Sequence, residues 1–173
     1  MAQTAVPVSV EEAVMAARIS PSRRFTRDVH LRGATQTALE TVGLWSRRND
    51  RLDTLSGGQQ RRVMVARALA CEASTLILDE PTAGIDADSE LRMADTLADL
   101  HSAGKTIILV THDLRESVFL ADTVYVMSKS PGRFVVRREI DLPRPRDLEI
   151  TYTPAFTDIV HDLRSHIGAF RKT

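Results

Sequence analysis

The sequence is short of several features that mark particular classes of protein. Its 173 residues include a single cysteine, Cys71, so the chain can form neither an internal disulfide nor a zinc site built from cysteines. The 23 basic residues balance the 23 acidic ones, which leaves no overall charge for binding nucleic acid or an anionic membrane. No apolar run approaches the roughly 20 residues that cross a bilayer. With no charged and then apolar leader after Met1, we expect a cytoplasmic protein that reaches any membrane through a partner.

What is present is the composition of a globular domain, with 43% hydrophobic and 27% charged residues. The N-terminal part predicts helices. Ser9 and Glu12 have the spacing of a capping box, and the helix that they begin should end at Pro21. A second amphipathic helix is predicted from Asp28 to Val42, with Gly43 as its C-cap.

From Leu55 onward the pattern alternates between helix and strand. Apolar runs that are too short for helices predict buried strands, and the segments between them repeat with the helical period. A strand, a helix and a strand in this order predict a right-handed crossover and parallel strands. We therefore expect an α/β fold in which helices cover a parallel sheet. The predicted elements are a helix opened by Ser56-Gly57-Gly58, strands at 75–78, 106–110 and 123–127, and helices at 87–101 and 113–120.

The C-terminal part has a different character. Apolar and polar side chains alternate along residues 134–140 well enough to predict an edge strand. Leu142-Pro143-Arg144-Pro145-Arg146 has to be an extended connector, because prolines at this density exclude a helix. Residues 156–170 predict a terminal helix.

Two predicted strands end in side chains that suit phosphate chemistry. The first ends in Asp79-Glu80 and the second in Thr111-His112. Ligands of open parallel sheets bind outside the carboxyl ends of the strands, so these residues should face one crevice if the strands are neighbours. Neighbouring carboxylates on an extended segment point in opposite directions, which lets one hold a cation while the other faces a reacting water. The set suits metal-assisted phosphoryl transfer, although each residue alone also fits a solvated strand end.

A glycine-rich helix entrance is the second candidate site. It has the sequence Leu55-Ser56-Gly57-Gly58-Gln59. Two glycines let a ligand approach the backbone, and the free N–H groups and positive dipole of the first turn favour phosphate. A simple N-cap with glycine flexibility is the alternative, because a pair of glycines at a helix start is common.

Four motifs follow one another along the chain, at 55–59, 76–82, 83–86 and 111–113. Their order resembles the nucleotide-binding subunits of ABC transporters, in which they are similar to the signature motif, the Walker B strand with its catalytic glutamate, the D-loop and the switch histidine. The resemblance covers essentially the whole chain. It implies an α/β fold with an incomplete P-loop NTPase (RecA-like) core, a parallel sheet and the family's helical subdomain. The implied parts are a helical subdomain at 1–70 that ends in the signature helix, part of the ATPase core at 71–140, and a C-terminal extension with a terminal helix at 141–173.

The resemblance also implies a role for each site residue. Asp79 would organise Mg²⁺, Glu80 would polarise or deprotonate the attacking water, and His112 would contact the γ-phosphate of ATP. The signature loop would close over ATP held by a second nucleotide-binding subunit in a head-to-tail dimer, and Asp86 would help to link the two sites. The residues implied to face nucleotide are Leu55, Ser56, Gly57, Gly58, Gln59 and Asp86.

The chain departs from the family in one large feature. No G-x-x-x-x-G-K-[ST] phosphate loop occurs in the sequence, and Gly104-Lys105-Thr106 runs from helix into strand, the reverse of what such a loop needs. Binding of ATP by the chain alone should therefore be weak, and apolar faces of its sheet should be uncovered. A truncated reading frame is the favoured explanation, with a degraded gene and a half-subunit completed by another chain as alternatives. Gln3 is a weak match to the family's Q-loop glutamine.

The function implied by the resemblance is that of an ATP-hydrolysing subunit of an importer. Such a subunit sits on the inner face of the cell membrane through a permease and is served indirectly by a periplasmic or lipoprotein substrate-binding protein. The alternative is a non-catalytic module that supplies only the signature face to a complete ATPase partner. A soluble ABC protein of DNA repair or translation fits less well, because such proteins usually carry long insertions or tandem cassettes.

The two halves of the chain resemble different importers. Up to Asp88 the sequence is most similar to importers of zinc or manganese. The tail, above all 111–116, 127–133 and 141–146, is similar to importers of nitrate, sulfonates and taurine. The longer match of the tail favours a sulfonate or nitrate importer, and a hybrid origin is the alternative.

Overall fold

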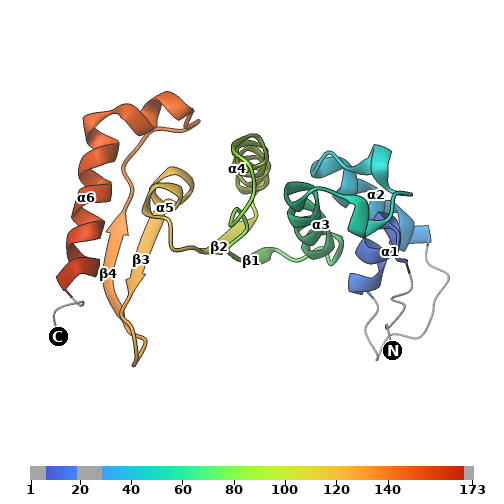
Figure 1. Cartoon of the computed structure of the whole chain (residues 1–173), viewed down its shortest axis with the longest axis horizontal. Coiled ribbons are helices and arrows are strands. Elements are labelled where there is room, and N and C mark those ends of the chain that lie inside the picture. The colour runs from blue at the N-terminus through green and yellow to red at the C-terminus, as the bar shows by residue number, and fades with distance from the viewer. Residues whose placement is uncertain (1–6, 19–28, 170–173) are drawn as a thin grey trace. The chain divides into compact units, whose positions relative to one another are not determined.

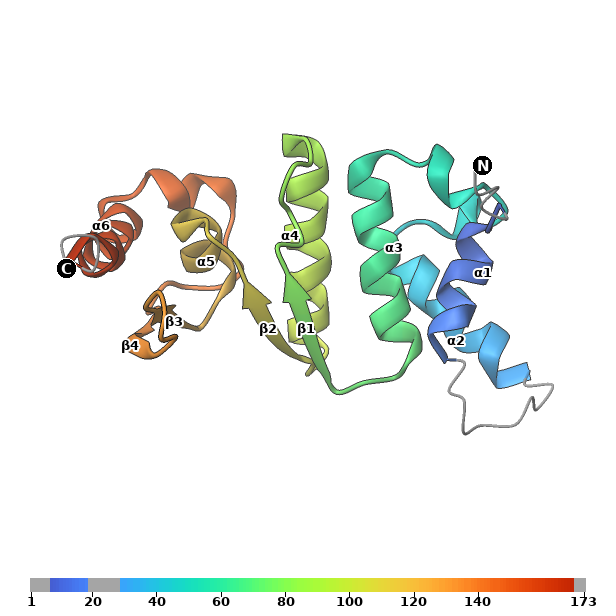
Figure 2. The ribbon, with the colours of Figure 1, turned by 60° about the horizontal axis from the view of Figure 1, so that its bottom comes forward.

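The structure, a computed structural model, describes residues 7–18 and 29–169. These residues form two compact units, one up to Ile108 and one from Leu109 onward (Figures 1 and 2). Gln3, Pro21 and Asp28, which carried predictions, lie outside the described residues. No helix in the described part is both long and apolar enough to cross a bilayer.

The first unit begins with helices and short helical turns. In chain order these are α1 (Val10–Met15), the 3-10 turn η1 (Ala16–Arg18), α2 (Val29–Thr41), the 3-10 turns η2 (Trp45–Arg47) and η3 (Leu52–Thr54), and α3 (Gly57–Ala70). The three α-helices contact one another. Their fully buried side chains include Val10, Val14, Leu39, Val63 and Ala66.

Two predicted helix ends in this unit are confirmed. The amide of Ser9 donates to Glu12 Oε2 over 2.8 Å, and the amide of Glu12 donates to Ser9 Oγ over 3.2 Å, which closes the predicted capping box. α2 is followed by Gly43, whose φ of +67° lies in the left-handed region. The amide of Leu44 then donates to the carbonyl of Leu39 over 2.8 Å, which is the long bond of a Schellman motif.

A strand, a helix and the first part of a second strand complete the first unit. They are β1 (Thr75–Asp79), α4 (Ala87–Ser102) and β2 (Thr106–Val110), in the predicted order. β1 and β2 form a two-stranded sheet, and their arrows point the same way in Figure 2. Leu76, on one face of β1, is 1% exposed, whereas Ile77 on the opposite face is 70% exposed. The α/β arrangement with parallel strands is thus confirmed, and one face of its sheet is apolar and open, as expected.

The second unit also mixes helices and strands. It contains α5 (Leu114–Leu120), β3 (Thr123–Met127), β4 (Phe134–Glu139), the 3-10 helix η4 (Leu148–Tyr152) and α6 (Pro154–Ala169). The predicted edge strand and terminal helix are therefore confirmed as β4 and α6.

The pairing of β3 differs from the expectation of a third parallel strand. β3 pairs with β4 in an antiparallel sheet, with Thr123 opposite Glu139 and Tyr125 opposite Arg137. The register shifts between Val126 and Met127. The connection between the strands is short, and a short connection allows only antiparallel pairing, because parallel strands need a crossover of a dozen or more residues.

An apolar core holds the second unit together. Side chains from α5, β3, α6 and the segment after β4 meet in it, and all are at most 9% exposed. The core residues are Val118, Val124, Val126, Ile140, Leu142, Phe156, Ile159, Val160 and Leu163.

The arginines of the proline-rich connector clamp the end of α5. The guanidinium of Arg146 contacts two segments of backbone. Its Nη1 donates to carbonyls at the end of α5, over 3.1 Å to Val118, 3.0 Å to Phe119 and 2.7 Å to Ala121. Its Nη2 donates to carbonyls after β4, over 3.4 Å to Ile140 and 3.3 Å to Leu142. Arg144 Nη2 donates to the carbonyl of Leu120 over 2.6 Å. Burial lowers the pKa of Arg146. The predicted extended connector thus satisfies carbonyls that the helix end leaves without intrahelical donors.

The three parts predicted from the motifs, at 1–70, 71–140 and 141–173, stay a prediction. The two compact units divide the chain by the density of its contacts. The three parts divide it by the order of motifs, which is a different property.

Candidate functional site

The glycine-rich helix entrance is a capped helix start, which we call the signature turn (residues 55–59). Ser56 is the N-cap of α3, and its Oγ accepts from the amide of Gln59 over 3.3 Å. In return the Gln59 side-chain oxygen accepts from the amide of Ser56 over 3.0 Å, so the turn is a complete capping box. The amides of Gly57 and Gly58 belong to the first helical turn, where no intrahelical acceptor is available. The turn therefore combines a fixed backbone with N–H groups that suit an anion.

Gln59 is held by a residue that the sequence analysis missed. Arg47 Nη1 donates to Gln59 Oε1 over 2.9 Å, and Arg47 Nε donates to Asp50 Oδ2 over 2.7 Å. The side-chain oxygen of Gln59 thus accepts from both Ser56 and Arg47, which leaves its NH₂ group as the part to offer a ligand. Arg47 lies twelve residues before Gln59 in a turn between helices, and no spacing rule links such positions.

The two glycines of the signature turn have different surroundings. A side chain at Gly57 would meet nothing within 4 Å. A Cβ at Gly58 would overlap both Oγ and Cβ of Ser89, which lies on α4. Gly58 is itself buried. Backbone flexibility can explain glycine at both positions, and at position 58 close packing against Ser89 is a second reason for glycine.

Asp86 lies beside the signature turn as the N-cap of α4. Its Oδ1 accepts from the amide of Ser89 over 3.0 Å, and its Oδ2 accepts from Ser89 Oγ over 2.8 Å. These hydrogen bonds, the one from the Ser89 hydroxyl first, lower the pKa of Asp86. Asp86 is consequently held as a carboxylate in one orientation.

A polar cleft of about 410 Å³ joins the signature turn to the start of α4. Within it, Arg62 Nη1 donates to the carbonyl of Val42 over 3.1 Å. Burial lowers the pKa of Arg62, and the positive charge of Arg92 adds to this effect while Asp86 opposes it. The cleft therefore carries charges of both signs. Its lining residues are Gly43, Leu44, Ser46, Arg47, Ser56, Gln59, Arg62, Asp86, Asp88, Ser89 and Arg92.

The end of β1 places the two neighbouring acidic residues on a sharp turn. Asp79 is the last residue of β1 and is exposed, and Glu80 follows with a φ of +47°. The amide of Ala83 donates to the carbonyl of Glu80 over 3.2 Å, which closes the turn. A left-handed backbone is uncommon for a residue with a side chain and clusters at functional positions. In the described part of the chain, no three His, Cys, Asp or Glu residues are grouped to hold a metal ion.

His112 belongs to the second unit. It is exposed and directly precedes Asp113, the N-cap of α5, whose Oδ1 accepts from the amide of Arg115 over 2.7 Å. The expected crevice shared by Asp79, Glu80 and His112 stays a prediction, since Asp79 and Glu80 belong to the first unit.

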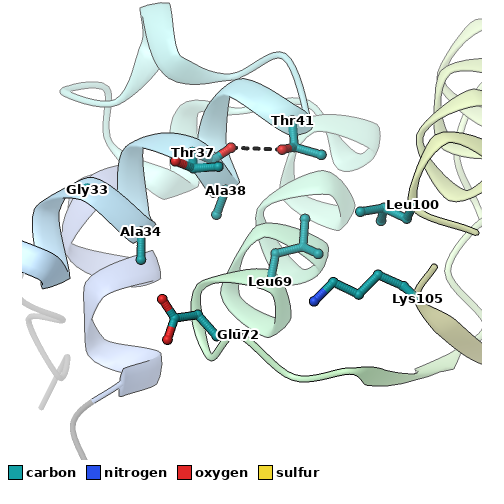
Figure 3. Close-up of a pocket in the computed structure, with 9 residues that line it drawn as sticks. All are labelled: Gly33, Ala34, Thr37, Ala38, Thr41, Leu69, Glu72, Leu100 and Lys105. Atoms are coloured by element: carbon teal, nitrogen blue, oxygen red, sulfur yellow. Dashed lines mark hydrogen bonds between the residues drawn. The ribbon is translucent and has the colours of Figure 1, made fainter. Parts of the chain in front are cut away.

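A second hollow of about 500 Å³ lies in the first unit between α2, α3 and the end of α4 (Figure 3). None of the motif residues lines it. Lys105 contributes to its wall and donates from Nζ to the carbonyl of Ala73 over 2.8 Å. Gly104, with a φ of +84°, ends α4 before β2 begins. The helix-to-strand order confirms that Gly104-Lys105-Thr106 is no phosphate loop.

Comparison with known proteins relates the whole arrangement to one family. The ABC transporter family matches residues 5–83 of this chain. The aliphatic sulfonates import ATP-binding proteins of Rhizobium johnstonii and Pseudomonas fluorescens are similar, with 38% identity over 94% of this chain and 40% identity over 89% of it. The alignments span 66% and 61% of those relatives, so the chain spans about three fifths to two thirds of their length.

Solved structures show the same fold. The ATP-binding cassette of an ABC transporter superposes with a TM-score of 0.73 and 19% identity, over 95% of this chain and 63% of the cassette. Because the two alignments cover 94% and 89% of this chain, both include the signature turn and the end of β1, which lie well inside it. Together with the ordered motifs, these findings show that the chain belongs to the family of ABC transporter ATP-binding subunits.

Proposed function

We propose that this chain serves as an ATP-binding subunit of an ABC importer and that its signature turn faces nucleotide held by a second subunit. The observation that carries the proposal is the capped turn at Ser56 with the Asp86 cap directly beside it, on one polar cleft. Helix amides and a serine hydroxyl on one surface suit phosphate oxygens. Gln59 lines the same cleft and Gly57 is exposed beside it, whereas Leu55 and Gly58 are buried and would support this surface by packing beneath it.

The end of β1 suits the chemistry of ATP hydrolysis. Mg²⁺ is usually held by one or two carboxylates together with substrate phosphates and waters, so the single exposed carboxylate of Asp79 fits it without a protein cage. When bound with ATP, Mg²⁺ would neutralise charge on the phosphates. Glu80 would accept hydrogen bonds from the attacking water and take up its proton. His112 would donate to the γ-phosphate.

The partners follow from the family. ATP-binding subunits of ABC transporters work in pairs and with membrane-spanning permeases. We propose a second nucleotide-binding subunit opposite the signature turn, a permease that holds the pair at the inner face of the membrane, and a substrate-binding protein that acts through the permease. The relatives import aliphatic sulfonates, and the alignments cover 89% and 94% of this chain, which takes in residues 111–146 of its tail. Aliphatic sulfonates are therefore the proposed substrate class.

An assay with a complete partner tests the proposed site. The chain is mixed with the Pseudomonas fluorescens relative, and complex formation is measured with and without Mg-ATP by sedimentation. Ser56→Arg should abolish the ATP-dependent complex, because the larger side chain covers the amides of the turn. Ser102→Arg, the same change at an exposed position at the end of α4, is the control and should leave the complex intact. The proposal is overturned if the amount of complex does not depend on ATP, or if the Ser56→Arg variant still forms the ATP-dependent complex.

Turnover of the same mixture separates the two functions that the sequence left open. Glu80→Gln should slow hydrolysis at the site to which Glu80 contributes by roughly 10²- to 10⁴-fold. If Ser56→Arg stops turnover while Glu80→Gln leaves it unchanged, the chain supplies only a signature face. That outcome would remove Glu80 from the catalytic role.

Complementation tests the substrate class. The gene is expressed in a bacterium that lacks the ATP-binding subunit of its sulfonate importer, with ethanesulfonate as the only sulfur source. Restored growth on the sulfonate, without faster uptake of nitrate or zinc, is the expected result. Uptake of nitrate or zinc instead would assign the chain to another importer.

A further inference from the structure

We propose that Ser89 is a positioning residue that links the Asp86 cap to the signature turn, so that both keep one geometry toward the facing subunit. The motif comparison names Asp86 and Gly58 but gives no role to Ser89. The part of the proposal that concerns binding of the facing subunit and its nucleotide rests on the proposed function. Its geometric part stands on the contacts of the first unit alone.

The first contact is with Asp86. Ser89 is 9% exposed and lies in the first turn of α4. Its hydroxyl and its amide each donate to a different oxygen of the Asp86 carboxylate, over 2.8 and 3.0 Å. Two bonds to two oxygens fix the carboxylate plane, whereas a single bond would leave it free to rotate. Ser89 thereby sets the orientation of Asp86.

The second contact is with Gly58. The space that a Cβ at Gly58 would need is filled by Oγ and Cβ of Ser89. The Cα of Ser89 would lie 3.7 Å from a Cβ at Gly58, which is an ordinary van der Waals distance. The side chain of Ser89 thus lies directly against the backbone of the signature turn.

The two contacts come from one small side chain, and this is what couples the two motifs. A larger residue at position 89 would push α3 away from α4, because interiors leave no free volume for extra atoms. Alanine would keep the packing but remove the hydroxyl that holds Asp86. Glycine would remove both. Serine is the residue that meets both requirements.

A rescue experiment tests the packing. Gly58→Ala should lower the melting temperature by roughly 2–12 °C, because the added methyl group overlaps Ser89. Gly57→Ala, the matched control in the same turn, should shift it far less, since nothing lies within 4 Å. The double variant Gly58→Ala with Ser89→Gly should recover most of the loss. Equal effects of the two single changes, or no recovery, would overturn the geometric part.

A binding experiment tests the positioning role. In the mixture with the Pseudomonas fluorescens relative, Ser89→Ala should raise the partner concentration needed for half-maximal turnover by roughly 10- to 150-fold, the effect of losing one hydrogen bond to a charged group. The turnover at saturating partner should stay within about twofold. A merely structural role would instead lower the active fraction, and with it the maximal turnover, at an unchanged half-maximal concentration. Ser102→Ala, at the other end of α4, is the control.

The outcomes separate this proposal from the function on which it rests. If the unchanged chain forms no ATP-dependent complex, the proposed function fails, and the rescue of melting temperature still decides the packing role of Ser89. If the complex forms and Ser89→Ala binds like the unchanged chain, the positioning role is wrong while the proposed function stands.

Discussion

The two units bury their side chains in different ways. The second unit has a core to which α5, β3 and α6 contribute, and the half-buried guanidinium of Arg146 satisfies backbone carbonyls around it. In the first unit, β1 and β2 leave apolar side chains open, with Ile77 70% and Ile108 48% exposed. The hydrogen bonds of Arg47, Gln59 and Asp86 lie at the cleft beside the signature turn. Both units therefore have a buried core, and the first unit also carries an open apolar sheet face and a polar cleft.

The largest expected effect tests whether the second unit depends on its core. Phe156→Ala removes a fully buried ring and should lower the free energy of unfolding by about 3–5 kcal/mol. Ile77→Ala in the open face of β1 should change it by less than about 0.5 kcal/mol, because the side chain is mostly in water. Chemical denaturation followed by circular dichroism measures both. Equal losses would remove the contrast between the units.

Arg146 tests whether the clamp on α5 is structural. Arg146→Met removes donors to five carbonyls and should cost about 2–4 kcal/mol of unfolding free energy, since buried acceptors lose their partners. Arg146→Lys should recover only part of this loss, because an ammonium cannot reproduce the planar fork of a guanidinium. Arg164→Met, at an exposed position on α6, is the control. A loss no larger than the control would show that water replaces the clamp.

Backbone strain is a second difference between the units, and relieving it should make the first unit more stable. In the described part of the chain, the non-glycine residues with positive φ are Glu72 and Glu80, both in the first unit. Glu72 follows the end of α3 with a φ of +57°, so Glu72→Gly should raise the unfolding free energy by about 1 kcal/mol without affecting turnover. Glu80→Gly should give a similar gain in stability and lose hydrolysis. A loss of stability in both variants would show that the side chains outweigh the backbone strain.

The smallest expected effect concerns the charge of the Asp86 cap. Its pKa lies below the ordinary value of a carboxyl, so the cap stabilises the fold above the ordinary pKa and is lost as the pH falls through the lowered one. Ser89→Ala should move the pKa of Asp86 up toward its ordinary value. Asp88, Arg62 and Arg92 line the same cleft and are the charged neighbours of this carboxylate. Carboxyl chemical shifts followed by NMR measure the change, and an unmoved pKa would show that these neighbours, not Ser89, hold the carboxylate.

Much of the fold could be predicted because its causes are local. The capping box at Ser9, the C-cap at Gly43 and the strand, helix and strand order all follow from spacing rules that operate within a few residues. The antiparallel pairing of β3 was missed. Helical period and apolar runs identify a strand but do not name its neighbour, and here the short connection to β4 decided it.

The residues of the candidate site likewise fall into those that the sequence predicts and those that only the structure reveals. Ser56 and Gln59 were recognised from sequence, and the capping box confirms that their spacing has a local physical cause. Arg47 and Ser89 were not recognised, because each acts on the signature turn across a gap in the chain. The roles of Asp79, Glu80 and His112 at nucleotide stay predictions.

The sequence by itself determined the elements, the caps at Ser9 and Ser56, and the order of motifs that shows the family, because these depend on neighbours along the chain. Only the tertiary structure decided that Arg47 holds Gln59, that Ser89 excludes any side chain at Gly58, and that Arg146 clamps α5. The physical reason is that such contacts join residues brought together by the packing of whole helices and strands. Their geometry is set by that packing and has no period or spacing in the chain.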